Sequence, residues 1–347
     1  MCRRPCAVYR DCSAAGPRRC AHGLPSRWVM PSVVTLGESM VLFRAEQSGP
    51  LREATTFRRH IAGAESNLAI GLARLGHDAG WIGRVGDDEF GRAIVFRLRG
   101  EGVDVSRVIV DADAPTGVVF REQREHGPIE VAYYRRGSAA SRLSVSDLDA
   151  GYIASARYLH LTGITPALSE TCRAAVFAAA EIARAAGVSV VLDPNLRLKL
   201  WRRDEARAVL RELATRCDVL LPGAEEAELL TGEAEPAVAA RALLGIGPKL
   251  VVIKVGAQGC MAVWTESADL LHIAAAPLAR VVDPVGAGDA FAAGFLSGCL
   301  RGLDLAETLA LANRCGAAAM AAPGDVEALP RWQDVEAAWP LGVDVHR

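Results

Sequence analysis

The sequence predicts an α/β fold in which a mostly parallel β-sheet lies between two layers of helices. From residue 32 onward, short β-branched runs alternate with longer segments rich in Ala and Leu, as in repeated strand–helix–strand units. Runs such as residues 188–192 are largely apolar, which indicates strands buried on both faces. The chain has 347 residues, 51% of them hydrophobic, which is enough for one large domain or two of ordinary size.

The expected elements follow one another along the chain. The pattern predicts strands at residues 33–37, 80–85, 157–161, 188–193, 217–221, 249–254 and 260–264. It predicts helices at residues 65–75, 88–100, 170–186, 203–215, 224–231, 236–244, 288–301 and 305–321. Gly76 and Gly187 stand where two of these helices should end, as glycines commonly do.

Two stretches break the alternation of strands and helices. Residues 40–62 and 112–138 are polar and aromatic, and both are typical of β segments without helices between them. We expect them to pair into a small sheet beside the main one, as a discontinuous lid built from insertions. The main domain should then span residues 30–335, and residues 336–347 should form a C-terminal tail.

The first 29 residues do not resemble part of a domain. They carry six arginines against one acidic residue and have no apolar core, so they do not form a secretory signal. The arginine content fits a transit peptide, but the amphipathic periodicity is missing. Their four cysteines lack the C-x₂-C spacing that is typical of zinc sites. We expect a disordered extension, with translation starting at or near Met30.

Composition narrows the class of function. Lys and Arg number 39 against 41 acidic residues, so a dedicated nucleic-acid-binding protein is disfavoured. No uninterrupted apolar run reaches 18 residues, so no membrane-spanning helix is expected. The cysteines beyond residue 29 lie singly in apolar segments, which indicates buried thiols in a reducing compartment and predicts a cytoplasmic location. These are Cys172, Cys217, Cys260, Cys299 and Cys315.

The run at residues 281–291 (VVDPVGAGDAF) concentrates the chemistry. An apolar strand is followed by a glycine-rich turn and then by the start of an Ala-rich helix. Backbone amides at such a helix N-terminus form a site for a phosphate or for charge that develops on one. Asp289 could cap the helix, or it could act as the base for a substrate hydroxyl beside that phosphate site. A nicotinamide fingerprint is disfavoured, because its third glycine falls at Phe291.

This run resembles the C-terminal signature of the ribokinase-like (PfkB) carbohydrate kinases. The N-terminal counterpart resembles residues 62–76 (AGAESNLAIGLARLG) and residues 83–91 (GRVGDDEFG). The resemblance covers residues 32–330 with both signatures in order. It implies a three-layer α/β/α fold with a β lid, and ATP and Mg²⁺ as cofactors. Asp283 and the residues after Asp289 could also shape a site for a monovalent cation such as K⁺.

Within this family, three segments are similar to the 2-keto-3-deoxygluconate kinases. They are residues 193–201 (DPNLRLKLW), 133–139 (YYRRGSA) and 160–168 (HLTGITPAL). An arginine flanked by phenols suits a sugar acid, because a guanidinium binds a carboxylate in bidentate fashion. Tyr133 and Tyr134 could instead be ordinary strand residues that point to opposite faces.

The resemblance also implies roles for individual residues. Asp289 would take the proton of the sugar hydroxyl, and the amides of Gly286, Ala287 and Gly288 would hold the transferring phosphoryl group. The sugar acid would contact Gly63, Tyr133, Tyr134, Arg135, Arg197 and Asp325. The nucleotide would contact Asn195, Lys254, Gly256, Gly259 and Asn313. Glu226 would act near the metal, unless it belongs to a solvated helix face, and Asp325 could be a plain turn residue.

The sequence departs from its relatives at two positions. Gly223 stands where Asn or Ser is common, and Val119 where related keto-deoxygluconate kinases can carry a substrate-binding Tyr. The nearest alternative is therefore a fructokinase or another sugar kinase of this fold. A non-catalytic, sugar-binding regulator is the alternative from a different class, although such a protein has no chemical need for Asp289.

Because lid strands of relatives often pair, we expect a homodimer or higher oligomer through the lid.

Overall fold

The computed structural model describes residues 30–124, 130–278 and 280–338. The expected extension at residues 1–29 lies outside these residues, as does most of the expected C-terminal tail. A helix, α11 (Trp332–Ala338), continues three residues into that tail. None of the helices within the described ranges is both long enough and apolar enough to cross a membrane.

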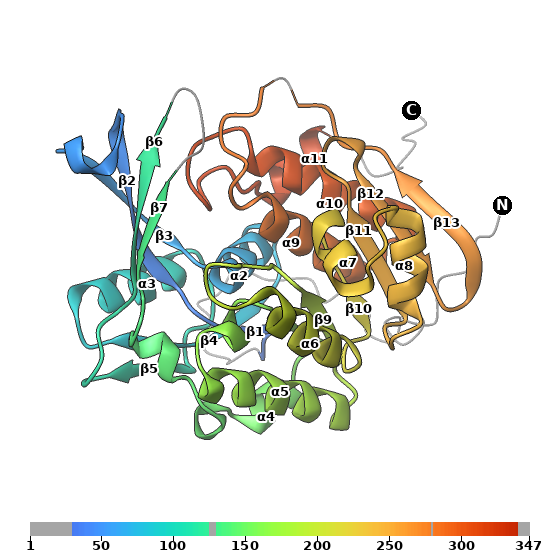
Figure 1. Ribbon diagram of the computed structural model, residues 1–347, viewed down its shortest axis with the longest axis horizontal. Helices are drawn as coiled ribbons and strands as arrows, with labels where there is room; N and C mark the ends of the chain where they lie inside the picture. Colours follow the sequence, from blue (N-terminus) through green and yellow to red (C-terminus); the bar gives the residue numbers. More distant parts are fainter. Residues whose placement is uncertain (1–29, 125–129, 279, 339–347) are drawn as a thin grey trace, which may run out of the picture.

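A nine-stranded sheet forms the centre of the molecule (Figure 1). Its spatial order is β13-β12-β11-β10-β9-β8-β1-β4-β5, and neighbours from β11 to β5 are parallel, as predicted. Strands β12 and β13 are added in antiparallel fashion at one edge. The strands are β1 (Val33–Leu36), β4 (Ala79–Gly86), β5 (Val108–Asp111), β8 (Tyr158–Thr162), β9 (Ser189–Asp193), β10 (Val219–Leu220), β11 (Leu250–Lys254), β12 (Cys260–Trp264) and β13 (Ser267–Ile273).

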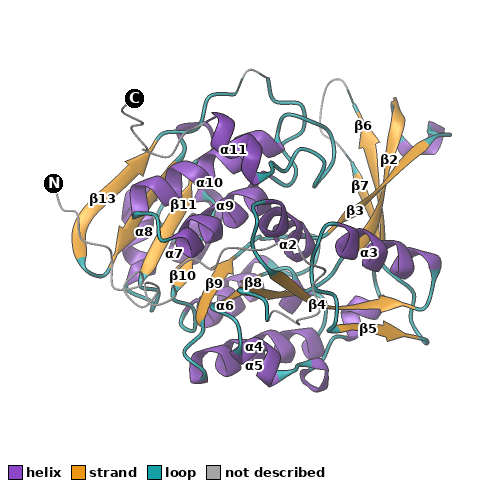
Figure 2. Ribbon diagram, turned by 180° about the vertical axis from the view of Figure 1, so that it is seen from behind, coloured by secondary structure: helices purple, strands orange, loops and turns teal. Residues whose placement is uncertain are grey.

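Helices cover both faces of this sheet and give three layers (Figure 2). One face packs against α2 (Ala64–Arg74), α3 (Glu89–Gly100), α9 (Ala287–Arg301) and α10 (Leu305–Ala319). The other face packs against α4 (Ala150–Ala154), α5 (Glu170–Ala185), α6 (Arg203–Ala214), α7 (Ala224–Thr231) and α8 (Pro236–Leu244). Gly76 and Gly187 follow α2 and α5 with φ of 85° and 74°, as expected of glycines that end helices.

The two β segments that interrupt the alternation pair into a second, four-stranded sheet (Figure 1). It consists of β3 (Phe57–Ala62), β2 (Met40–Ser48), β6 (Val118–Gln123) and β7 (Val131–Tyr134), in that spatial order. We call this sheet the lid. The central pair β2–β6 is parallel, and the outer pairs are antiparallel. Its inner face carries a small apolar cluster of Met40, Leu42, Ala62 and Val119, with Val131 packed against it.

Strands β5 and β13 were not predicted. Strand β13 has no continuous apolar run, because Ser267 and Asp269 are among its first residues. It lies at the edge of the sheet. Edge strands need no continuous apolar run, because only part of their surface is covered. Their pairing partners, which sequence periodicity does not reveal, stabilise them.

Candidate active site

A cleft of about 1190 Å³ opens between the carboxyl ends of the central strands and the inner face of the lid. Its floor contains the residues that follow β9, β10 and β11, together with the turn that leads into α9. The lid supplies Met40, Leu42, Val119 and Val131 to its wall. Ligands of open α/β proteins bind at this end of the sheet, so the topology and the cleft point to the same place.

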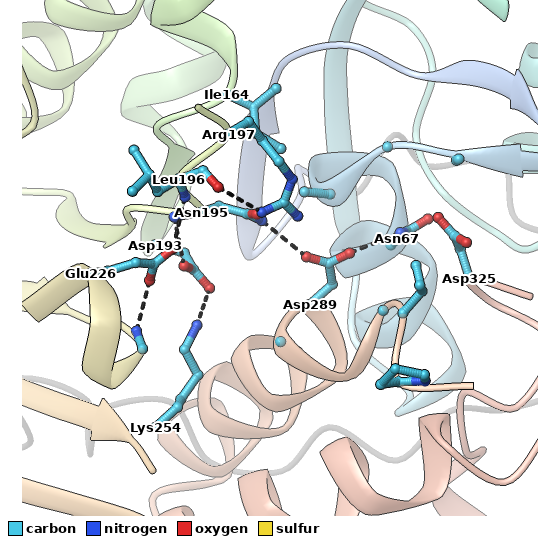
Figure 3. A pocket seen from close by; sticks show the side chains of 18 of the residues that line it. Asn67, Ile164, Asp193, Asn195, Leu196, Arg197, Glu226, Lys254, Asp289 and Asp325 are labelled. Atoms are coloured by element: carbon cyan, nitrogen blue, oxygen red, sulfur yellow. Dashed lines mark hydrogen bonds and ion pairs between the residues drawn. The ribbon is translucent and has the colours of Figure 1, made fainter. Parts of the chain in front are cut away.

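Asp289 lies in the first turn of α9 and faces the cleft (Figure 3). Its Oδ2 accepts a hydrogen bond of 2.8 Å from Nδ2 of Asn67, and its Oδ1 accepts one of 3.4 Å from Nδ2 of Asn195. Burial raises the pKa of Asp289 to about 7, with Asn67 acting in the opposite direction. Because both oxygens bond to side-chain amides, the contacts favour a base over a helix cap.

The turn before Asp289 depends on glycine. Gly286 has φ of +82° and caps α9, and a Cβ at this position would lie 2.5 Å from the backbone oxygen of Asp325. Gly286 and Gly288 line the cleft, as predicted for an anion site at a helix N-terminus. Ala287 does not line it, and its N–H donates to the oxygen of Pro284 over 3.4 Å.

Lys254 ends β11 and reaches into the cleft next to this turn (Figure 3). Its Nζ lies 2.6 Å from Oδ2 of Asp193. Burial opposes the charge of Lys254, but the neighbouring carboxylates, led by Asp193 and then Glu226, outweigh it and raise the pKa of Lys254. The ammonium group therefore stays charged beside Gly288, whose ideal Cβ position is 3.7 Å from Nζ. Such a point charge is suited to a phosphate.

Glu226 does not belong to a solvated helix face. Its Oε1 accepts a 2.7 Å hydrogen bond from the N–H of Leu196, and its Oε2 accepts another of 2.7 Å from the N–H of Gly223. The carboxylate thereby joins the start of α7 to the loop that follows β9. Among the described residues, no group of three His, Cys, Asp or Glu side chains is arranged to hold a metal ion.

Asn195 has φ of 40°, which places a non-glycine residue in the left-handed region. Its N–H donates to Oδ1 of Asp193, and its side chain points toward Asp289. A strained residue is retained where the surroundings fix it, and active sites are common locations. We assigned Asn195 to the nucleotide, but the structure brings it next to the catalytic candidate.

On the sugar side, Gly63, Tyr133, Arg135, Arg197 and Asp325 all line the cleft, as predicted. Arg135 is paired with the buried carboxylate of Glu38, and its guanidinium lies 5.5 Å from the ring centre of Tyr133. Arg197 is exposed, and its Nη1 donates to the oxygen of Leu196. Of these two arginines, Arg135 is neutralised by Glu38, whereas Arg197 forms no salt bridge with another described residue.

Besides Ala287, the structure does not bring three further predicted residues into the cleft. Tyr134 is on the outer face of the lid, 69% exposed, with its ring against Phe120. Gly259 packs against the backbone after β13. Asn313 donates from Nδ2 to the oxygens of Ile273 and Ala274 and holds that same segment. Alternation along β7 separates Tyr133 from Tyr134, which is the ordinary strand arrangement left open above.

Sequence reasoning missed Asn67, Glu38 and Arg121 among the residues of the site. Asn67 lies within the N-terminal signature, and its signal is that of a polar residue in an otherwise apolar helix. Glu38 and Arg121 are 2% and 5% exposed. Glu38 lies between β1 and β2, and Arg121 lies in β6. Such single charges carry no spacing pattern, so only their partners in the folded chain reveal them.

The sequence profile of the pfkB family carbohydrate kinases matches residues 30–332. The chain belongs to the pfkB family of carbohydrate kinases. A 2-dehydro-3-deoxygluconokinase from Bacillus subtilis (strain 168) is 43% identical over 300 residues, which cover 86% of this chain and 92% of the relative. One from Thermoproteus tenax is 39% identical and covers 92% and 97%. A fructokinase from Zea mays is 35% identical and covers 87% and 96%.

Solved structures of pfkB-type kinases share the fold. A PfkB protein from Polaromonas sp. JS666 has a TM-score of 0.81 at 41% identity and covers 88% of this chain and 99% of that chain. A putative ribokinase from E. coli, solved with ATP and Mg²⁺, has a TM-score of 0.82 at 28% identity, with 88% and 98% covered. A fructokinase double mutant from Vibrio cholerae O395, solved with fructose, ADP and potassium, has a TM-score of 0.78 at 27% identity, with 90% and 99% covered.

Proposed function

We propose that this pfkB kinase phosphorylates 2-keto-3-deoxygluconate (2-dehydro-3-deoxygluconate) with ATP and forms the 6-phospho sugar acid. The observation that carries the proposal is Asp289, a carboxylate held by two amides beside the glycine turn in a cleft that also contains Arg135 and Arg197. The two 2-dehydro-3-deoxygluconokinases support the choice of sugar acid.

In the proposed reaction, Asp289 takes the proton of the primary hydroxyl as that oxygen attacks the terminal phosphoryl group of ATP, whose bond to ADP breaks as ADP leaves. Asn67 and Asn195 hold the carboxylate in place, so that the ionised form faces the hydroxyl. The amides of Gly286 and Gly288, together with the charge of Lys254, stabilise negative charge on the transferring group. Catalysis then rests on positioning and on electrostatics, as in other phosphoryl transfers.

The residues present fit ATP and Mg²⁺. Gly286, Gly288, Lys254 and Gly256 offer the amides and the positive charge that phosphates need. When bound, ATP supplies the phosphoryl group and Mg²⁺ neutralises phosphate charge. Because Glu226 already accepts two backbone N–H groups, it would act on Mg²⁺ mainly through water, which suits an ion that keeps its waters.

A specific observation favours the alternative, a kinase for a neutral sugar such as fructose. The Arg135–Glu38 ion pair leaves no net charge on its part of the cleft wall. It places a hydrogen-bond donor beside an acceptor, and a sugar hydroxyl can bond to both because it donates and accepts. A sugar acid would have to share Arg135 with Glu38 or bind Arg197. The sugar-acid proposal therefore predicts that activity depends strongly on Arg135 or Arg197, whereas the neutral-sugar alternative predicts a weaker dependence on both.

The experiment that tests the function is ATP-dependent ADP release by the purified full chain with Mg²⁺. 2-Keto-3-deoxygluconate, its galacto epimer, fructose, ribose and adenosine are offered in parallel, with and without K⁺. Turnover with the keto-deoxy acids is the expected result. Turnover with fructose or ribose alone would favour the neutral-sugar alternative, and binding without turnover of any of them would favour a regulator.

The pKa of Asp289 predicts the pH dependence of the reaction. Only the ionised carboxylate accepts a proton, so kcat/KM should rise as pH increases through about 7 and level off above pH 8. An ordinary aspartate would give a profile that is flat above about pH 5. Initial rates at low substrate concentration between pH 5.5 and 8.5 measure this, and a flat profile would contradict the role of Asp289 as the base.

We further propose a homodimer that forms through the lid, in the cytoplasm. The outer face of the lid carries the contacting rings of Phe43, Phe57, Phe120 and Tyr134, an aromatic surface suited to a second lid. Light scattering of the full chain tests the dimer. The free, buried thiols Cys172, Cys217, Cys260, Cys299 and Cys315 support a reducing compartment.

A further inference from the structure

Arg121 connects the lid to the segment that leads into α9. It lies on the inner face of β6, 5% exposed, and lines the cleft. Its Nη2 donates to Oδ2 of Asp283, and its Nη1 lies 3.8 Å from Oδ1 of Asp325. A buried arginine is costly unless carboxylates compensate it, and here both partners come from outside the lid.

Asp283 joins this arginine to two loops. Its Oδ1 accepts a hydrogen bond of 3.2 Å from the N–H of Val285, which begins the glycine turn. Its Oδ2 accepts another of 3.2 Å from the N–H of Gly324, next to Asp325. One carboxylate therefore fixes the turn, the 324–325 segment and the lid relative to one another.

Asp325 extends the connection to the proposed base. Figure 3 shows Asn67 between Asp325 and Asp289; its Nδ2 donates to Oδ2 of Asp289, and its side chain favours the ionised form of Asp325 by lowering the pKa of that carboxyl. The backbone oxygen of Asp325 also lies directly against Gly286. A shift of Asp283 or Asp325 would thus move both the glycine turn and the amide that holds Asp289.

The charges at this junction need Arg121. Asp283 and Asp325 are 4% and 7% exposed, and the charge of Asp283 disfavours ionisation of Asp325. Burial raises the pKa of Asp325 to about 6, and Arg121 opposes that rise. Arg44 on β2 also faces Asp283, and the His60–Glu327 pair, 2.8 Å apart, lies beside Asp325. Two buried carboxylates without the guanidinium would separate or bind protons.

We propose that Arg121 is a positioning residue that transmits the closed position of the lid to the glycine turn and to Asp289. The inference rests on the proposed role of Asp289 as the base. In the closed position of the lid, the guanidinium of Arg121 is buried against Asp283 and Asp325. When the lid moves away, the guanidinium contacts water instead. With the lid in place, the turn and the base are held in the arrangement that phosphoryl transfer needs.

The test combines kinetics with hydrogen exchange on the full chain. Arg121→Met should lower kcat by about 100-fold, the effect of a small misplacement, while the Kd for ATP changes less than threefold. Arg121→Lys should recover part of kcat. Amides of residues 285–289 should exchange faster in Arg121→Met without any substrate, a readout that does not depend on which sugar reacts. Arg58→Met, at an exposed lid arginine paired with Glu46, is the control and should match wild type.

A double-mutant cycle separates this role from direct substrate binding. Arg121→Met combined with Asp283→Asn should lose about as much kcat as either change alone, because both break the same contact. Losses that multiply, or a raised KM with unchanged kcat, would overturn the proposal, as would unchanged exchange at residues 285–289. Retained turnover in Asp289→Asn would instead overturn the proposed role of Asp289 as the base. The hydrogen-exchange result would then decide whether Arg121 positions the glycine turn.

Discussion

Asp289→Asn should reduce kcat by about 10³-fold or more while ATP and the sugar acid still bind. Loss of a general base commonly costs 10²–10⁴-fold. Asparagine keeps the shape, but its amide has one acceptor oxygen, so it can accept from Asn67 or Asn195 and not from both as the carboxylate does. Steady-state ADP release and calorimetric titration with each ligand measure the two effects.

Thermal unfolding provides the control for this variant. The pKa of Asp289 is raised in the folded chain, so ionising it costs folded-state stability, and stability falls as pH rises from the unfolded pKa of about 4 to the folded value of about 7. Asp289→Asn removes that cost, so its Tm at pH 8 should equal or exceed that of the wild type. A large drop in Tm, or turnover within tenfold of wild type, would contradict the assignment.

Arg135→Ala should lower kcat/KM for 2-keto-3-deoxygluconate by about 100-fold, since a charged, bidentate contact with a carboxylate is worth about 3 kcal/mol. The same change should alter activity toward fructose far less if any is present. It also leaves Glu38 buried and unpaired, so the Tm should fall. Burial already raises the pKa of Glu38, and protonation will limit that loss of stability.

The matched control for this prediction is Arg135→Ala combined with Glu38→Gln. Removing both charges should restore most of the Tm but not the affinity for the sugar acid. Recovery of both would mean that Arg135 only neutralises Glu38. In that case the carboxylate would be bound by Arg197, and Arg197→Ala should produce the 100-fold loss instead.

The sequence predicted those features that depend on residues close to one another along the chain. The parallel sheet, the eight longer helices and their glycine ends follow from hydrophobic periodicity, which depends on neighbours along the chain. The turn at residues 286–288 was predicted because a positive φ at Gly286 requires glycine at one position. The ordered signatures then indicated the family, and the match over residues 30–332 confirmed it.

The tertiary structure decided which charges meet. Asn67 and Asp289 are 222 positions apart, Arg121 and Asp283 are 162 apart, and no local pattern links either pair. The pairing of Arg135 with Glu38 and the outward position of Tyr134 likewise depend on the register of the lid strands. Burial sets the pKa of Asp289, and burial exists only when helix, lid and sheet have closed around the carboxylate.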